Sequence, residues 1–288
     1  MYGGVSEALA LRVNQFLEGV RGIERGRIEL ISRVAEGNPD RLPALAAEIV
    51  TQKVDVVFAT GPAAVRAAHS AAQGPVVALD LETDPVQSGL IFSLSHPGGN
   101  LTGVFFDFPE FSTKWLELLR EVLPRLSRVA VLWDPSTGPV QLNAVEKVGG
   151  SMGLSLQVIE VKEVSHIEQA VGVARKENAE ALLLLSSPMF GSNPATSAKI
   201  ALENRFPAVT MFPEFAQTGG LMAYGPNISE LYRQAGAMVA KVLAGAAPAD
   251  LPIERPVRFQ LVINLKTAKA LGLDVPWFLQ QRADEVIE

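Results

Sequence analysis

The sequence contains no cysteine, no long apolar run and no cluster of basic residues. Without cysteine, the chain cannot form disulfides, hold an iron–sulfur cluster through thiolates or use a thiol nucleophile. The densest apolar stretch, ALLLL at 181–185, is far shorter than the roughly 18 residues that a membrane-spanning helix needs. Lysines and arginines are scattered singly and the formal net charge is −6, so no nucleic-acid partner is predicted.

Catalytic motifs are also scarce. The three histidines, His69, His96 and His166, are far apart and match no metal-ligand spacing. The glycine-rich phosphate-binding strings are absent. GGSMG at 149–153 matches the string G-x-S-x-G, but it ends a predicted helix instead of joining a strand to a helix, which argues against Ser151 as a nucleophile. We therefore predict a protein that is not an enzyme and that uses no metal and no cofactor.

The chain does contain short apolar runs that alternate with helical patterns. VDVVFAT at 54–60 and the run at 179–187 are typical of strands buried on both faces of a parallel sheet. In each half of the chain, two such strands lie about 20–26 residues apart with a helix between them, which fits a βαβ unit. A length of 288 residues suits two domains. The pattern predicts an α/β fold with two similar lobes.

In open parallel sheets, ligands bind beyond the carboxyl ends of the strands. Polar or aromatic residues at these places are the candidate ligand-binding residues: Thr60, Gly61, Asp84, Asp134, Ser187, Glu214 and Tyr224. A hydroxyl and free backbone amides at 60–61 suit a carboxylate, whereas the acidic side chains suit an ammonium group. Serine, threonine and aspartate are also the residues that cap helices, so a purely structural role for each stays open.

The segment SHPGGNLTGV at 95–104 predicts a sharp turn followed by an extended strand. We expect Gly98 and Gly99 to tighten the exit from the first lobe, so that LTGV runs as the first hinge strand. On this interpretation the turn is mechanical and has no direct chemistry. Replacing both glycines by valine is predicted to damage folding or closure.

Four further stretches carry a family resemblance. They are AEGNPDRLPALAAEIV, DPVQSGLIFSLSHPGGNLTGV, KWLELLREVLPRLSRVAVLWDP and LPIERPVRFQLVINLKTAKALGLDVP. They resemble successive signatures of the ABC-transporter substrate-binding proteins of the type I periplasmic-binding fold, a group with tryptophan- and tyrosine-binding members. The resemblance implies two Rossmann-like lobes with parallel sheets, joined by a three-segment hinge, with the ligand clamped between the lobes.

The resemblance also implies boundaries and roles. The first lobe would comprise 1–104 plus about 226–256, and the second 105–225 plus about 257–288, with hinges at 103–105, about 223–226 and about 255–258. Thr60 and Gly61 match the position of the family's G-T-P-A-A loop, and Asp84 matches its D-P step. Asp134 stands where the family usually has asparagine, which adds a negative charge.

The expected function is that of the solute-binding component of an ABC importer, a monomer that passes a small ligand to a membrane permease. An aromatic amino acid or related aromatic acid is the first ligand expected, by resemblance. Two alternatives are a cytoplasmic ligand sensor that regulates a partner protein and a two-lobed small-molecule isomerase.

The beginning of the chain differs from the family pattern. Family members usually begin with a signal or lipoprotein sequence and a first strand, but only MYGGV precedes the helix that matches SEALALRVNQFLEGV. We expect either a truncated start or a protein that has lost this strand. The family implies a periplasmic or membrane-anchored extracytoplasmic location.

Overall fold

A computed structural model describes the chain apart from residues 1–6, 22–27, 37 and 107. The chain divides into two compact units. Unit 1 comprises Met1–Phe106 and Ile228–Pro256, and unit 2 comprises Asp107–Asn227 and Val257–Glu288. The backbone therefore passes from one unit to the other three times. No helix among the described residues has the length and apolar character needed to cross a membrane.

Unit 1 is built on a parallel sheet of three described strands in the order β1-β2-β3. The strands are β1 (Val57–Thr60), β2 (Val76–Asp80) and β3 (Leu101–Phe105). The helices are α1 (Glu7–Val20), α2 (Leu42–Thr51), α3 (Pro62–Ala71) and α10 (Ile228–Leu243), with 3-10 turns at Pro39–Arg41 and Pro248–Asp250. Every residue of β2 and β3 is buried, as the apolar runs predict for a sheet covered on both faces.

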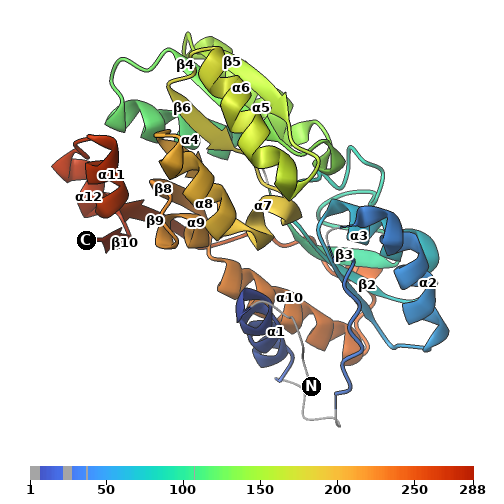
Figure 1. Ribbon diagram of the computed structural model, residues 1–288. Coiled ribbons are helices and arrows are strands. Elements are labelled where there is room, and N and C mark those ends of the chain that lie inside the picture. Colours follow the sequence, from blue (N-terminus) through green and yellow to red (C-terminus); the bar gives the residue numbers. More distant parts are fainter. Residues whose placement is uncertain (1–6, 22–27, 37, 107) are drawn as a thin grey trace. The chain divides into compact units, whose positions relative to one another are not determined.

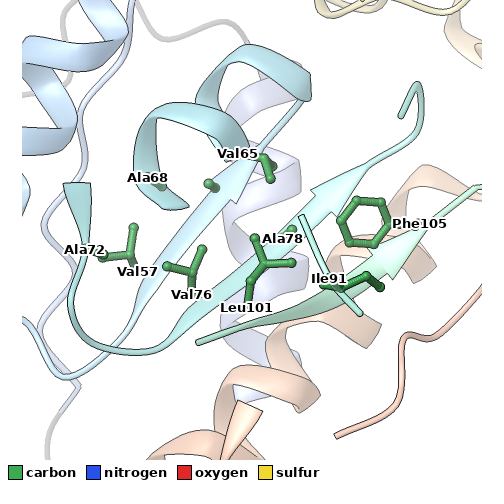
Figure 2. Close-up of a cluster of buried hydrophobic side chains, with 10 residues drawn as sticks. Val57, Val65, Ala68, Ala72, Val76, Ala78, Ile91, Leu101 and Phe105 are labelled. Atoms are coloured by element: carbon green, nitrogen blue, oxygen red, sulfur yellow. The ribbon is translucent and has the colours of Figure 1, made fainter. Parts of the chain in front are cut away.

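Alternate side chains of β2 enter two different apolar clusters of unit 1. Val76 and Ala78 pack with residues of β1, α3 and β3 on one face of the sheet (Figure 2). Val77 points to the opposite face, where α1 and α10 supply Phe16 and Met238. Figure 1 shows α1 lying alongside α10. The period-two alternation of a strand therefore places helices of unit 1 over both faces of its sheet.

Unit 2 contains a seven-stranded sheet in the order β10-β9-β8-β7-β6-β4-β5. The strands are β4 (Arg128–Trp133), β5 (Ser155–Glu160), β6 (Ala181–Leu184), β7 (Ala208–Thr210), β8 (Met222–Pro226), β9 (Phe259–Asn264) and β10 (Glu285–Ile287). The helices are α4 (Phe108–Val122), α5 (Val140–Ser151), α6 (Ile167–Lys176), α7 (Pro188–Ser192), α8 (Pro194–Glu203), α9 (Pro213–Gln217), α11 (Leu265–Leu271) and α12 (Trp277–Arg282).

Strands β4 to β8 are mutually parallel, so their carboxyl ends share one edge of the sheet. Strand β9 is antiparallel to β8, and β10 runs parallel to β9. The prediction of an α/β fold with parallel-dominated sheets is thus confirmed. The antiparallel pairing of β8 with β9 was not part of that prediction.

The glycine turn lies inside unit 1, immediately before β3. Gly98 has a φ of 78°, the left-handed region that favours glycine, whereas Gly99 has an ordinary φ and open space around it. The following LTGV segment belongs to β3, which pairs with β2 along its whole length. The Phe105 amide also donates to Glu254 O at 3.0 Å, and the Glu254 amide donates to Gly103 O at 2.9 Å. Only one of the two glycines therefore has a conformational reason to be there.

Candidate functional site

In unit 1, Thr60 and Gly61 lie where β1 ends and α3 begins. Gly61 has a φ of 81° and occupies the N-cap of α3, which explains glycine at this position. Its amide donates to Leu79 O at 2.9 Å, so it continues the pairing of β1 with β2. The expectation of a free amide at Gly61 is therefore wrong. Thr60 is exposed, and its side chain is hydrogen-bonded to the hydroxyl of Tyr232.

Tyr232 of α10 is a neighbour of Thr60 that the sequence interpretation missed. Burial raises the pKa of the Tyr232 hydroxyl, while Arg12 of α1 and hydrogen bonds with Arg12 and Thr60 act in the opposite direction. The ring of Tyr232 also meets Phe58 edge-on, with centroids 6.1 Å apart. On the sequence, this tyrosine is only one member of an amphipathic helix, so nothing separates it from ordinary core residues.

The end of β2 carries two aspartates whose carboxylates organise the following loop. Asp80 is fully buried, and its Oδ1 accepts the amides of Glu82 and Thr83, each at 3.0 Å. Burial raises the pKa of Asp80 in spite of these hydrogen bonds and the charge of Arg66. Asp84 is half-buried, and its Oδ1 accepts the amides of residues 86 and 87, each at 2.9 Å. Asp84 therefore has a structural role at the start of the turn at 85–89, and no helix follows it directly.

In unit 2, Asp134 and Ser187 also begin short helical segments. Asp134 directly follows β4, is 6% exposed, and accepts the Ser136 amide at 2.9 Å through Oδ1. Ser187 is fully buried, and its Oγ accepts the Phe190 amide at 3.2 Å at the start of α7. Glu214 is half-buried in the first turn of α9. All three lie just past carboxyl ends of parallel strands, as predicted.

The loops that carry Asp134 and Ser187 are joined by a residue that sequence reasoning missed. Gln141 is fully buried in the first turn of α5. Its Nε2 donates to Ser186 O at 2.6 Å, and its Oε1 accepts the Ser186 amide at 2.8 Å. The structure therefore connects the segment after β4 with the segment after β6.

Tyr224 differs from the other candidates because it lies within β8. Its ring is 5.6 Å from that of Phe111 and 6.4 Å from that of Phe259, measured between centroids. Burial, and secondarily the charge of Asp284, raises the pKa of its hydroxyl. The backbone carbonyl of Tyr224 accepts the indole N–H of Trp115 at 2.7 Å. These contacts favour a packing role for the ring within unit 2.

Among the residues that the structure describes, no group of three histidine, aspartate or glutamate side chains is placed to hold a metal ion. The polar groups at the strand ends are carboxylates, hydroxyls and helix-capping loops, which suit the polar groups of a small organic ligand.

Comparisons with known proteins bear on the family. The model of the family described as "ABC transporter substrate binding protein" matches residues 5–287. The chain belongs to this family. The tyrosine-binding protein of Clostridioides difficile is 24% identical over 241 residues, which cover 83% of this chain and 69% of the relative.

Solved structures place this substrate-binding protein in a known fold. The ABC domain from Streptococcus pneumonia in complex with L-Trp superposes with a TM-score of 0.88 at 23% identity, covering 98% of this chain and 96% of the other. A periplasmic binding protein/LacI transcriptional regulator from Alkaliphilus metalliredigens, complexed with D-xylulofuranose, has a TM-score of 0.60 at 10% identity. The match covers 90% of this chain and 94% of the other. The α/β fold is that of the type I periplasmic binding proteins, as the resemblance implied.

Proposed function

We propose that this family member is the solute-binding component of an ABC importer and that its ligand is an aromatic amino acid or a related aromatic acid. The observation that carries the proposal is the family match along residues 5–287. The ligand class is supported by the names of two similar proteins, one tyrosine-binding and one in complex with L-Trp. No catalytic step is part of the proposal.

Each unit supplies polar groups from the carboxyl edge of its parallel sheet. In unit 1 these are the Thr60 hydroxyl, the start of α3 at Gly61 and the Asp84 carboxylate. In unit 2 they are Asp134, Ser187 and Glu214, with Tyr224 as the least supported member because of its aromatic packing. A carboxylate of the ligand suits hydroxyls and helix starts, whereas an ammonium group suits the acidic side chains.

The remaining parts of the proposal follow from the family. The protein acts as a monomer outside the cytoplasm, in the periplasm or anchored to a membrane, and delivers its ligand to a permease. The two units correspond to two lobes, and the three chain crossings at 106–107, 227–228 and 256–257 supply the hinge.

A thermal-shift screen of the purified protein tests the proposal. L-tryptophan, L-tyrosine, aromatic acids, aliphatic amino acids and sugars are each added over a concentration series. A ligand at 100 times its Kd that binds only the folded state stabilises it by about 2.7 kcal/mol. We expect a saturable rise in Tm with aromatic compounds, which are recovered chemically unchanged.

Two outcomes would contradict the proposal. A saturable shift with sugars alone would refute the ligand class and leave a binding protein. Conversion of any compound during the incubation would refute the non-catalytic role. A matched pair of variants refines the result: Asp134→Ala removes both the charge and the cap at residue 136, whereas Asp134→Asn keeps an acceptor for the cap.

A further inference from the structure

Gln141 is a buried amide that joins two candidate loops and is not itself one of the candidate ligand-binding residues. It is fully buried in unit 2, and so are the Ser186 and Thr137 groups that it meets, which are 0% and 2% exposed. A buried side-chain amide costs folding free energy unless its donors and acceptor are satisfied. Here both ends of the amide are used. Its geometry therefore indicates what the residue does.

The Gln141 amide pairs with the backbone of Ser186 in both directions. Nε2 donates to Ser186 O at 2.6 Å, while Oε1 accepts the amide of the same residue at 2.8 Å. This two-point contact resembles the pairing of one strand residue with another, and it fixes the peptide plane as well as its position. Ser186 precedes Ser187, whose hydroxyl caps α7. The start of the second loop is thus held by a side chain from α5.

The same amide reaches the loop after β4. Nε2 also donates to the hydroxyl of Thr137 at 3.1 Å, and this hydroxyl donates to Asp134 O at 2.7 Å. Strands β4 and β6 are neighbours in the sheet, with Leu132 opposite Leu184, so their carboxyl-end loops begin side by side. A continuous hydrogen-bond path therefore runs from Asp134 through Thr137 and Gln141 to Ser186.

We propose that Gln141 is a positioning residue that couples the Asp134 loop to the Ser187 loop, so that the two candidate ligand-binding loops adopt one fixed geometry. Linked polar groups of this kind act as a unit, because losing one member leaves the others buried without partners. The coupling itself is a property of unit 2. Its consequence for affinity rests on the proposed function.

The first experiment compares Gln141→Met with wild type by amide hydrogen exchange. Methionine has a similar length but cannot replace the three hydrogen bonds. We expect the peptides covering 134–138 and 185–188 to exchange together at least tenfold faster, while peptides of unit 1 are unchanged. Thr267→Val is the control, since Thr267 is 4% exposed and its hydroxyl donates one hydrogen bond to Gly219 O at 2.9 Å. A general loss of stability in unit 2 would affect both variants alike.

The second variant, Gln141→Glu, provides a chemical rescue and keeps the test decisive if Gln141→Met does not fold. A protonated glutamic acid accepts from the Ser186 amide and donates one hydrogen bond through its O–H, so it restores two of the three hydrogen bonds, whereas the ionised form has no donor. Burial raises the pKa of a carboxyl at this position. The variant should therefore protect both loops more strongly at pH 5 than at pH 8, with less protection than wild type at either pH. Equal protection at both pH values, or acceleration of only one loop, would overturn the coupling.

Affinity is measured separately with L-tryptophan and L-tyrosine as probes. If wild type binds either one, Gln141→Met should weaken binding about fivefold or more, while Thr267→Val changes it less than twofold. Unchanged affinity in Gln141→Met would overturn the positioning role and leave the proposed function intact. If neither probe binds wild type, the ligand proposal fails, and the exchange experiments still decide the coupling.

Discussion

Two glycines at the crossing of α1 and α10 allow the most direct test of the packing in unit 1. A Cβ atom at Gly236 would lie 2.1 Å from Phe16 O, and one at Gly19 would lie 2.1 Å from Arg233 O. Ordinary contacts of a Cβ begin near 3.4 Å. An alanine at either position therefore requires the helices to separate by about 1 Å. The Phe16 ring, stacked on Phe58 at 4.4 Å, would lose part of its contact.

The expected magnitude is a balance of two opposing effects. Glycine-to-alanine substitution in a helix interior favours folding by about 1 kcal/mol. Overpacking a close contact costs about 1–3 kcal/mol. Gly172 in α6 is the matched control, because nothing lies within 4 Å of a Cβ built there. Since helix propensity cancels in the comparison, we expect Gly236→Ala to be less favourable than Gly172→Ala by about 1–3 kcal/mol.

Hydrogen exchange measures each unit separately, which is needed because Gly236 lies in unit 1 and Gly172 in unit 2. The opening free energies of the most protected amides in α10 and α6 are compared with those of wild type. We expect the opening free energy in α10 to fall in Gly236→Ala and the opening free energy in α6 to rise in Gly172→Ala. Gly19→Ala combined with Gly236→Ala should cost less than the sum of the single changes, because the helices have already separated. Equal stabilisation at Gly236 and Gly172 would refute the close-contact argument.

Three further predictions concern the strand ends and the turn. The raised pKa of Asp80 means that the folded state keeps its proton to higher pH than the unfolded chain, whose pKa is about 3.9, so this residue's contribution to stability is lost as pH rises through the folded pKa. Between pH 4 and pH 7, the midpoint urea concentration of unfolding should therefore fall less in Asp80→Asn than in wild type. Equal changes of the midpoint with pH in the two proteins would contradict this. Asp134→Asn should leave Tm within about 2 °C, because the acceptor for the Ser136 amide is kept, but should change the ratio of affinities for amino acids and their deaminated acid analogues in calorimetry. Gly98→Val should lower Tm because of its φ of 78°, whereas Gly99→Val should be nearly neutral, and a larger loss at Gly99 would rule out this explanation.

The fold class was predictable because buried parallel strands leave a strong signal in sequence. The run at 181–185 is apolar throughout and the segment at 76–80 is apolar up to Asp80, and both form buried strands. Helix α4 and strand β8 were not predicted. The Gly-rich surroundings of β8 hide a short strand, and the antiparallel direction of β9 depends on a connection through unit 1 that no local pattern encodes.

The candidate site was predictable in position and less so in detail. Residues directly after parallel strands are easy to find, and Asp134 and Ser187 both lie there. Whether the polar atoms of such residues already have hydrogen-bond partners within the protein depends on the register of the strands and on residues distant in sequence. The Gly61 amide is engaged by Leu79 because β2 continues one residue past the end of β1. Gln141 was missed because a polar residue in a predicted helix gives no sign that it will face a neighbouring loop.

Capping and ligand binding are separable roles for the same carboxylate. Backbone amides hold one oxygen of Asp84 at the start of a turn and one oxygen of Asp134 at a helical cap, and so they fix the direction of each side chain before any ligand arrives. Preorganisation of this kind reduces the ordering cost of binding. A carboxylate that serves only as a cap should tolerate asparagine with no change in ligand preference. A carboxylate that also binds an ammonium group should lose affinity on the same change while Tm stays constant, so the comparison of affinity with Tm distinguishes the two roles at each position.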